Sequence, residues 1–594
     1  MRLSIAVVLG LLLVGCSEPA DTAAVPDNAV PAVVEAAVET AAETVGDDND
    51  WSLGFMAAVA NPYATDAAAE MLARGGHAVD AAIAAHAVLG LVEPESSGLG
   101  GGGFMVLYEA DSGDVRFLDG RETAPMAASA DMFMRDGEPM PYLQAWQSGR
   151  AVGVPGAVAL YKLAHERYGQ LDWAEIFEPA INLAREGFLV TEKMANYLPG
   201  IANIARLDEN PGSAEYFYPN GEPLQAGDLL RNPEYANTLQ AIVEQGPQAF
   251  YTGEIAEAIV ASAQAEPDAG SLTMEDMAAY EAIERPAVCG PWRELTICSA
   301  TPPSSGAMQI MVANLYDHLL PDNASQEQQI QAFVDAQRLA YADRDYYFGD
   351  PDRVDVPIEQ LLDPAYIEYR ASNPVAPDAI PEHGYPRMVL GEAAAAVFAP
   401  DSTREPAGTT HYSIVDSYGN AVSVTMTVES VFGSNRWAAG FLLNNEMTDF
   451  ARNYDPNQPE AANAVRPGAR PRSSMSPSIL LNADGELYMV TGSPGGNSIP
   501  AYTAKTILAT EDWGLTVQEA VDFPNIIARG QSVRVETGRE PGQALADYLN
   551  EAGYDVQESE GENSGLHVIR VHGDHLEGAA DPRREGTVMT TAPL

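Results

Sequence analysis

Lysine and cysteine are scarce in this sequence of 594 residues. Only three lysines occur, Lys162, Lys193 and Lys505, and 32 basic residues stand against 85 acidic ones, so the formal net charge is −53. A surface this acidic repels nucleic acids and anionic membranes, because both carry charge of the same sign. We therefore expect neither a nucleic acid nor a lipid surface as a direct partner.

Long hydrophobic runs are missing after the first 16 residues. At the start, Arg2 precedes the apolar run 3–14, which is too short for a membrane span and typical of a signal peptide. Cys16 directly follows Leu-Val-Gly, an arrangement that resembles a bacterial lipobox. We expect residues 1–15 to be a lipoprotein signal peptide and Cys16 to carry a lipid that anchors the exported protein at the periplasmic face or surface of the outer membrane. An ordinary signal peptide, leaving a soluble periplasmic protein, is the alternative.

The composition changes near residue 53. Residues 16–52 are rich in Ala, Val, Glu and Asp and show no periodicity that requires a core. We expect them to form a tether between the lipid and a folded body that begins at residue 53.

The two cysteines beyond the leader, Cys289 and Cys298, flank a short segment. A two-residue loop at Arg293 and Glu294 would place them opposite each other at a non-hydrogen-bonded pair of a β-hairpin, where Cβ atoms lie closest. Exported proteins meet oxidising conditions, so a disulfide is expected. Two buried free thiols are the alternative.

Helices and strands occur in both halves of the chain. Helical patterns are expected at 65–74, 79–91, 173–185 and 501–510, and strands at 104–109, 409–416, 421–427, 478–481 and 487–491. The segment 416–420 between two of these strands has the composition of a hairpin turn. This distribution predicts a layered α/β fold rather than a doubly wound parallel sheet.

Several common catalytic machineries are absent. There is no Gly-x-Ser-x-Gly or His-Glu-x-x-His motif, and the nine histidines show no spacing suited to a metal, so neither a metal nor another cofactor is expected. The pattern Gly98-x-Gly100-x-x-Gly103 matches a dinucleotide fingerprint. A strand is expected after it, however, where that fold needs a helix N-terminus, so we reject a dinucleotide site.

Thr409 is the best candidate for a nucleophile. A threonine hydroxyl needs a base, and the α-amine of the same residue can serve once the bond after Gly408 is cut. Thr409 and Thr427 are equidistant from Tyr418, so a hairpin centred there places them opposite each other. Thr427 could then orient the Thr409 hydroxyl, although threonines facing each other across strands are common.

Motifs along most of the chain resemble the γ-glutamyltransferase (γ-glutamyltranspeptidase) family. The similarity spans about residues 55–590 and rests on Thr409-Thr-His-Tyr-Ser, Leu442-Leu-Asn-Asn-Glu-Met-Thr-Asp449, Pro471-Arg-Ser-Ser-Met-Ser-Pro477, Thr491-Gly-Ser-Pro-Gly-Gly496 and, upstream, Leu118-Asp-Gly-Arg-Glu-Thr-Ala-Pro125. The resemblance implies an N-terminal-nucleophile hydrolase fold, a four-layer αββα sandwich. It also implies self-cleavage between Gly408 and Thr409 into a large subunit, 53–408, and a small subunit, 409–594, that stay together as a heterodimer.

The resemblance also implies roles for individual residues. Arg121, Ser473 and Ser474 match groups that bind the α-carboxylate of the substrate, and Glu446, Asp449 and Glu429 lie where its α-ammonium is bound. Gly495 and Gly496 match the backbone N–H pair that stabilises an oxyanion.

The implied substrates are glutathione and other γ-glutamyl compounds. Thr409 would form a γ-glutamyl ester, which water or an acceptor amino acid or peptide then resolves. A glutaryl or cephalosporin acylase of the same superfamily is one alternative, against which Glu446 and Asp449 argue, because its substrates lack the α-ammonium. An inactive surface binding lipoprotein is the other, and the presence of Thr409, Thr427 and the double glycine speaks against it.

Overall fold

The computed structural model describes residues 53–393, 396–401, 403–406, 408–452 and 454–591. The predicted signal peptide, the lipidation site Cys16 and the tether therefore lie outside the described residues. Within those ranges no helix is both long enough and apolar enough to cross a membrane.

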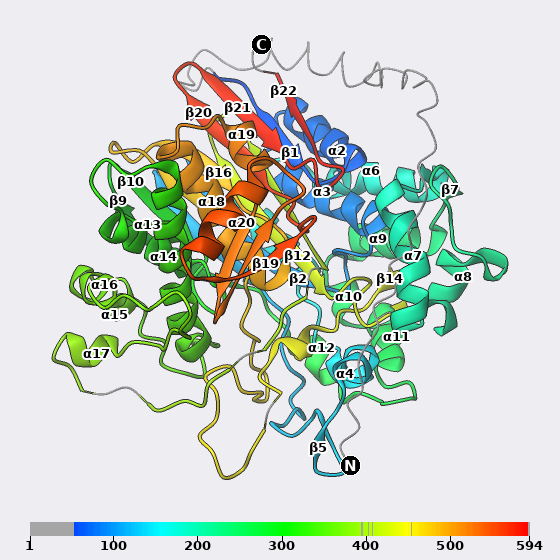
Figure 1. The fold of residues 1–594 in the computed structure, drawn as a ribbon. Helices are drawn as coiled ribbons and strands as arrows, with labels where there is room; N and C mark the ends of the chain where they lie inside the picture. Colours follow the sequence, from blue (N-terminus) through cyan, green and yellow to red (C-terminus); the bar gives the residue numbers. More distant parts are fainter. Residues whose placement is uncertain (1–52, 394–395, 402, 407, 453, 592–594) are drawn as a thin grey trace, which may run out of the picture.

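Two antiparallel sheets form the centre of the molecule (Figure 1). The first sheet has the order β22 (Thr587–Thr590), β1 (Met56–Val59), β11 (Gly408–Val415), β12 (Ala421–Glu429), β2 (Gly102–Glu109), β3 (Asp114–Gly120) and β8 (Ile283–Pro286). The second sheet has the order β21 (His575–Ala580), β20 (His567–His572), β16 (Leu487–Thr491), β15 (Ser478–Leu481), β10 (Leu295–Ser299) and β9 (Val288–Trp292). Each sheet combines strands from both sides of Thr409.

Helices cover the outer face of the first sheet. They include α2 (Pro62–Ala73), α3 (Ala78–Val92), α5 (Ala157–Tyr168) and α6 (Trp173–Glu186). On β2, Met105 and Leu107 pack with these helices, whereas Phe104 and Val106 face the second sheet. This alternation follows from the two-residue period of a strand and shows that both faces of the first sheet are buried.

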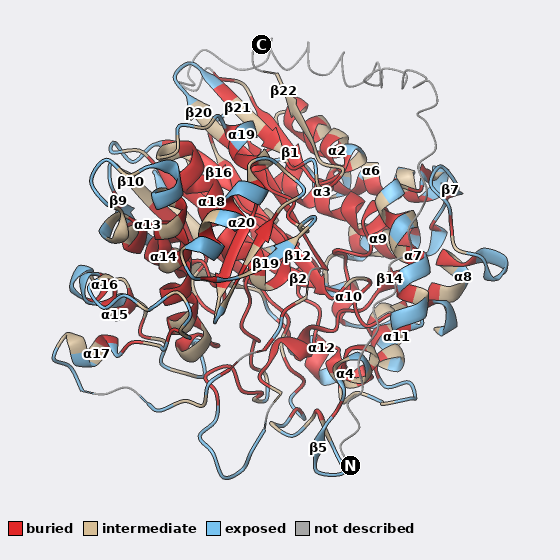
Figure 2. Ribbon diagram, viewed as in Figure 1, coloured by how far each residue is buried: buried red, intermediate tan, exposed pale blue. Residues whose placement is uncertain are grey.

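The second sheet is covered in the same way on its far side. Its helices are α13 (Ala307–Leu319), α14 (Gln326–Tyr347), α18 (Ile499–Glu511) and α19 (Val517–Asp522). Leu480 and Met489 pack toward them, and Ile479 and Val490 pack toward the first sheet. Figure 2 shows the buried residues concentrated in these central layers. The architecture is the four-layer αββα sandwich expected from the resemblance.

The remaining elements surround this sandwich. Among them are the helices α4 (Tyr142–Gln147), α7 (Glu192–Ala205), α8 (Ser213–Phe217), α9 (Pro233–Gln245), α10 (Gln248–Tyr251), α11 (Glu254–Ala263), α12 (Met274–Ala279), α15 (Ile358–Leu361), α16 (Pro364–Ala371), α17 (Pro386–Val389) and α20 (Gly542–Glu551), and a small sheet of β17 (Ile526–Arg529), β18 (Ser532–Glu536) and β19 (Asp555–Ser559). Three two-stranded sheets complete the described part of the fold: β4 (Met134–Arg135) with β5 (Glu138–Pro139), β6 (Phe188–Leu189) with β7 (Leu229–Leu230), and β13 (Trp437–Ala438) with β14 (Phe441–Leu442).

The expected start of the first helix was wrong by three residues. Helix α2 begins at Pro62, and the Asn61 side chain caps it by accepting the Tyr63 N–H at 3.1 Å. Proline at the first helical position has no N–H to leave unpaired, which favours this start. Thr65, the first residue of the expected helix, lies inside α2, and its hydroxyl donates to the Asn61 carbonyl.

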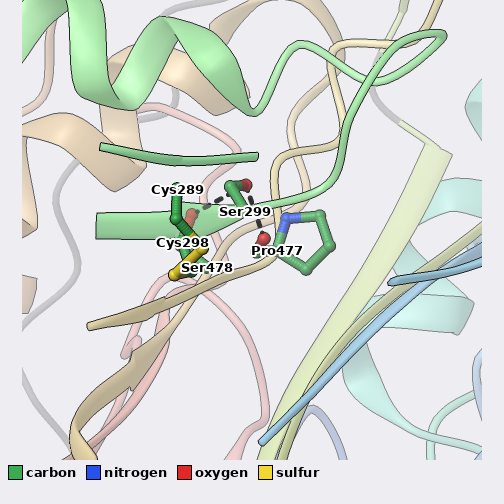
Figure 3. Close-up of a disulfide and its surroundings, with 5 residues drawn as sticks. All are labelled: Cys289, Cys298, Ser299, Pro477 and Ser478. Atoms are coloured by element: carbon green, nitrogen blue, oxygen red, sulfur yellow. Dashed lines mark hydrogen bonds between the residues drawn. A yellow bond between two sulfur atoms is a disulfide. The ribbon is translucent and has the colours of Figure 1, made fainter. Parts of the chain in front are cut away.

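The two cysteines form a disulfide in the second sheet (Figure 3). Strands β9 and β10 pair so that Cys289 lies directly opposite Cys298, with Cα atoms 4.1 Å apart, and the loop between them is the predicted Arg293-Glu294. The next residue, Ser299, donates a hydrogen bond of 2.6 Å to the Pro477 carbonyl. The disulfide thus joins the edge strand β9 to a strand that is held from both sides.

Candidate active site

Thr409 and Thr427 lie opposite each other on neighbouring strands at the centre of the first sheet. The register of β11 and β12 pairs Thr409 with Thr427 and Val415 with Ala421, as the hairpin centred on Tyr418 predicts. Their hydroxyl oxygens are 3.2 Å apart, and both residues are buried. The Thr427 hydroxyl also donates to the Gly408 carbonyl at 2.8 Å.

The pairing of β11 with β12 is interrupted at the bond between Gly408 and Thr409. Gly408 pairs with Glu429 while Thr409 pairs with Thr427, so β12 carries one extra residue in a bulge. Glu429 has a φ of 78°, which is strained for a residue with a side chain, and its N–H donates to Thr427 Oγ at 2.7 Å. A Cβ at Gly408 would lie 2.4 Å from the Glu429 carbonyl oxygen, so this tight approach requires glycine.

Arg584 and Glu93 hold the two residues that follow this bond. The Arg584 guanidinium donates to the Thr409 carbonyl at 2.7 Å. The Thr410 hydroxyl donates to Glu93 at 3.1 Å, and Glu93 forms an ion pair of 2.6 Å with Lys193, one of the three lysines. No motif or spacing in the sequence indicated a role for these supports.

Arg121, at the end of β3, is buried in an ion-paired cluster. Its guanidinium contacts Glu446 and, at 2.6 Å, Asp449, and it donates to the carbonyls of Pro471 and Arg472. The 3-10 turn η4 (Glu446–Asp449) presents both carboxylates. The structure therefore brings together the residues predicted to bind the two charges of a substrate. These residues form ion pairs with each other.

Buried carboxylates outnumber arginines around this cluster. Burial raises the pKa values of Glu429, Glu446 and Asp449 well above the ordinary carboxyl range, and Asp449 raises that of Glu429 further. Burial likewise raises the pKa of Glu122, a residue not predicted from the sequence, to about 8. A cation placed among these groups would stabilise their ionised forms.

Ser473 and Ser474 adjoin a further carboxylate, that of Glu405. The Ser474 N–H donates to Glu405 at 2.7 Å, and Arg344 donates both to Glu405 at 2.6 Å and to the Ser474 hydroxyl at 2.7 Å. The Ser473 hydroxyl accepts the Met475 N–H. Glu405 stands four residues before Thr409, which was the only signal in the sequence that it reaches the site.

Gly495 and Gly496 begin the short turn η5 (Gly496–Ser498) after β16. Their φ values are 135° and 56°, and a Cβ on Gly496 would lie 2.1 Å from the Glu405 carbonyl oxygen. Glycine is therefore needed at position 496, both for its dihedral angles and for the close approach of the backbone.

One small pocket collects nearly all the predicted residues. Its wall consists of Arg121, Glu405, Pro406, Thr409, Thr427, Glu429, Glu446, Asp449, Ser473, Ser474, Met475, Gly496 and Ile499. Gly495 lines a larger neighbouring cavity instead. Across the described part of the chain, no group of three or more His, Cys, Asp or Glu side chains is arranged to hold a metal ion.

The chain matches a known protein family. The model of the γ-glutamyltranspeptidase family matches residues 64–591. This chain belongs to the γ-glutamyltranspeptidase family. A glutathione hydrolase proenzyme of Escherichia coli is 36% identical over 542 residues, covering 89% of this chain and 90% of that protein, and one of Bacillus subtilis is 33% identical over 549 residues, covering 90% and 91%.

Solved structures of related proteins agree with this γ-glutamyltranspeptidase fold. A cephalosporin acylase from Bacillus halodurans superposes with a TM-score of 0.77 at 25% identity, covering 92% of this chain and 97% of that one. A γ-glutamyltranspeptidase from Pseudomonas nitroreducens, complexed with L-DON, is 34% identical with a TM-score of 0.50, covering 54% of this chain and 94% of that one. The chain is thus an enzyme of the γ-glutamyltranspeptidase kind. Because an acylase shares this fold, the residues of the pocket must indicate which substrate is bound.

Proposed function

We propose that this enzyme cuts its own chain between Gly408 and Thr409 and then uses Thr409 to cleave γ-glutamyl amides, glutathione among them. The hydrogen-bonded chain from Glu429 N–H through the Thr427 hydroxyl to the Gly408 carbonyl carries the proposal. It holds the hydroxyl of Thr409 beside the bond that must break.

The first reaction is an acyl shift from nitrogen to oxygen. Thr409 Oγ attacks the Gly408 carbonyl carbon, and the Thr427 hydroxyl stabilises the charge that develops on the carbonyl oxygen. Collapse of the intermediate breaks the C–N bond, protonates the nitrogen and leaves an ester. Water then hydrolyses this ester to a carboxylate on Gly408 and the free hydroxyl of Thr409. The α-amine of Thr409, already freed by the acyl shift, becomes the base for later turnover.

The two products, 53–408 and 409–594, would remain one particle. In the first sheet, β11 and β12 lie between β1 and β2, and in the second sheet β15 lies between β10 and β16. Separating the fragments would therefore break hydrogen-bonded ladders in both sheets and open the apolar core between them. A heterodimer of a large and a small subunit follows.

The γ-glutamyl head fits the charges of the pocket. A zwitterion can enter the ion pair of Arg121 with Glu446 and Asp449 without leaving a charge unpaired, because its carboxylate meets the arginine and its ammonium meets the acids. Ser473 and Ser474 supply further donors for the carboxylate. The backbone N–H groups of Gly495 and Gly496 would stabilise the oxyanion when Thr409 attacks the γ-carbonyl, and water or an acceptor amine then releases the γ-glutamyl group.

The excess of buried carboxylates favours a γ-glutamyl substrate over the glutaryl substrate of an acylase. A glutaryl side chain has no ammonium, so it would leave Glu446, Asp449 and Glu429 uncompensated. The decisive test compares release from γ-glutamyl and glutaryl anilides by the purified enzyme, with and without glycylglycine as acceptor. We expect a strong preference for the γ-glutamyl donor, and equal turnover of the two would contradict recognition of the α-amino group.

We also propose that the enzyme is a lipoprotein of the bacterial outer membrane, because Cys16 follows a lipobox-like sequence. Radiolabelled palmitate should label the wild type and not Cys16→Ser. Labelling of neither, with release of the protein into the soluble periplasmic fraction, would favour an ordinary signal peptide.

A further inference from the structure

A second cavity, of about 950 Å³, adjoins the γ-glutamyl pocket. Its wall contains four arginines, which is unusual in a chain of charge −53, and we name it the arginine cavity: Arg404, Arg452, Arg529 and Arg534. Two acids also line it, Asp345 and Glu405.

Both acids are already neutralised by arginines. Asp345 contacts Arg529 at 2.8 Å and Arg344 at 2.9 Å, and Glu405 contacts Arg344 at 2.6 Å. Arg534 is paired with Glu562, which lies outside the lining, at 2.6 Å. The excess positive charge of the arginine cavity therefore comes from Arg404 and Arg452.

Arg452 is the arginine best placed to receive a ligand. Its guanidinium stacks over the ring of Tyr142 at 4.7 Å, and within the described ranges no carboxylate lies in ion-pair distance of it. Its Nε is buried without a hydrogen-bond partner among the described residues. With no carboxylate of the described residues paired to it, the Arg452 guanidinium leaves its charge available to an anion in the cavity.

The arginine cavity and the γ-glutamyl pocket are separated by a thin wall. Glu405 and Pro406 line both, and Gly495 in the cavity precedes Gly496 in the pocket. Tyr142 bridges them as well, because its hydroxyl contacts Ser430, which is bonded to Glu429. Glu405 and Pro406 belong to the segment just before the bond at Gly408, so the wall between the two spaces lies beside the bond that is cut.

We propose that the arginine cavity binds a free carboxylate on the amine side of the donor, that is, on the leaving group. This rests on the proposed function. The γ-glutamyl head fixes one end of the substrate at Arg121, and the leaving group then extends past Thr409 toward Arg452 and Arg404. The arginine cavity thereby favours γ-glutamyl peptides with a free C-terminus over neutral γ-glutamyl amides, and locally offsets the repulsion of anions by the acidic surface.

Glutathione and its glycine ethyl ester test this directly, because they share the scissile amide and differ only in the distal carboxylate. Glutamate release by the mature enzyme gives kcat/KM for each, and their ratio is compared among wild type, Arg452→Gln, Arg404→Gln and the double variant. Arg466→Gln is the matched control, since Arg466 lies on the same loop as Arg452 and pairs with Glu460 outside the cavity.

We expect the double variant to lower the ratio of glutathione to ester about tenfold, the effect of one lost charge contact of moderate strength. The Arg466→Gln control should keep the wild-type ratio. A ratio unchanged in the double variant, including one in which both substrates lose activity equally, would overturn the proposal. Failure of the wild type to release glutamate from either substrate would instead contradict the proposed function itself.

Discussion

The hydroxyl oxygens of Thr409 and Thr427 lie 3.2 Å apart across the central strands of the first sheet. The same Thr427 oxygen accepts one hydrogen bond from the backbone and donates another to the Gly408 carbonyl. Thr427 is therefore placed to act twice, by polarising the carbonyl during self-cleavage and by orienting the Thr409 hydroxyl afterwards.

Thr427→Val should slow self-cleavage about 100-fold or more, since valine keeps the shape of threonine and removes the donor to the developing oxyanion. The fraction of split chain on a denaturing gel over time measures this rate. Thr427→Ser is the matched control, because it retains the hydroxyl. Splitting of the valine variant at the wild-type rate would show that the hydroxyl plays no part.

Arg121→Lys should reduce kcat/KM for a γ-glutamyl anilide about 100-fold while self-cleavage proceeds. The planar guanidinium contacts Glu446 and Asp449 at once, and the single ammonium of lysine cannot reproduce that fork toward a carboxylate. Arg116→Lys, on the strand β3 that leads to Arg121 but partly exposed, is the control and should retain activity. Near-normal kcat/KM in Arg121→Lys would argue that Arg121 only supports the fold.

Donor binding should depend on pH through the carboxylates of the pocket. Burial raises the pKa values of Glu429, Glu446 and Asp449, so part of this set is protonated at pH values where ordinary carboxylates are ionised. Only ionised groups attract the α-ammonium. KM for a γ-glutamyl anilide should therefore fall as pH rises, with a midpoint above the ordinary carboxyl range.

Glu429→Gln should move that midpoint to lower pH, because the Glu429 charge contributes to the raised pKa of Glu446. A glutaryl anilide, which has no ammonium, provides the comparison and should not show this fall in KM. The same KM profile for both donors would mean that the titration reports something other than ammonium binding.

Loss of the disulfide should lower stability without affecting catalysis. Removing a link that closes so short a loop is expected to reduce the free energy of unfolding by about 2–3 kcal/mol. Cys289→Ala/Cys298→Ala is best compared in the Thr409→Ala background, which keeps a single chain during denaturant unfolding. With Thr409 intact, the double variant should retain wild-type kcat/KM, since β9 lies at the edge of the second sheet and Thr409 at the centre of the first.

The local features of the site could be predicted from the sequence. The pairing of Thr409 with Thr427 follows from a symmetric hairpin around Tyr418, and that of Cys289 with Cys298 from a two-residue loop. In each case the partners are close in sequence, so turn geometry alone sets the register. The prediction of four layers rested on the family resemblance, because local patterns do not determine which strands become neighbours.

Local sequence patterns could not predict the contacts between distant segments, and only the family resemblance placed Arg121, Glu446 and Asp449 in one site. Arg121 meets Glu446 and Asp449 only because β3 and the turn η4 converge in the folded chain, and Arg584 reaches Thr409 from near the C-terminus. Glu405 carries no motif that would mark it, and its role depends on the path of the segment before Gly408. These side chains are charged residues in a chain with many others, so composition gave no reason to select them.

The most direct test of the account is the N-terminal sequence of the smaller fragment of the purified enzyme. We predict that it begins at Thr409, with the sequence Thr-Thr-His-Tyr-Ser, and that Thr409→Ala remains a single chain. A smaller fragment that begins at any other residue, or a wild-type chain that never splits, would contradict it.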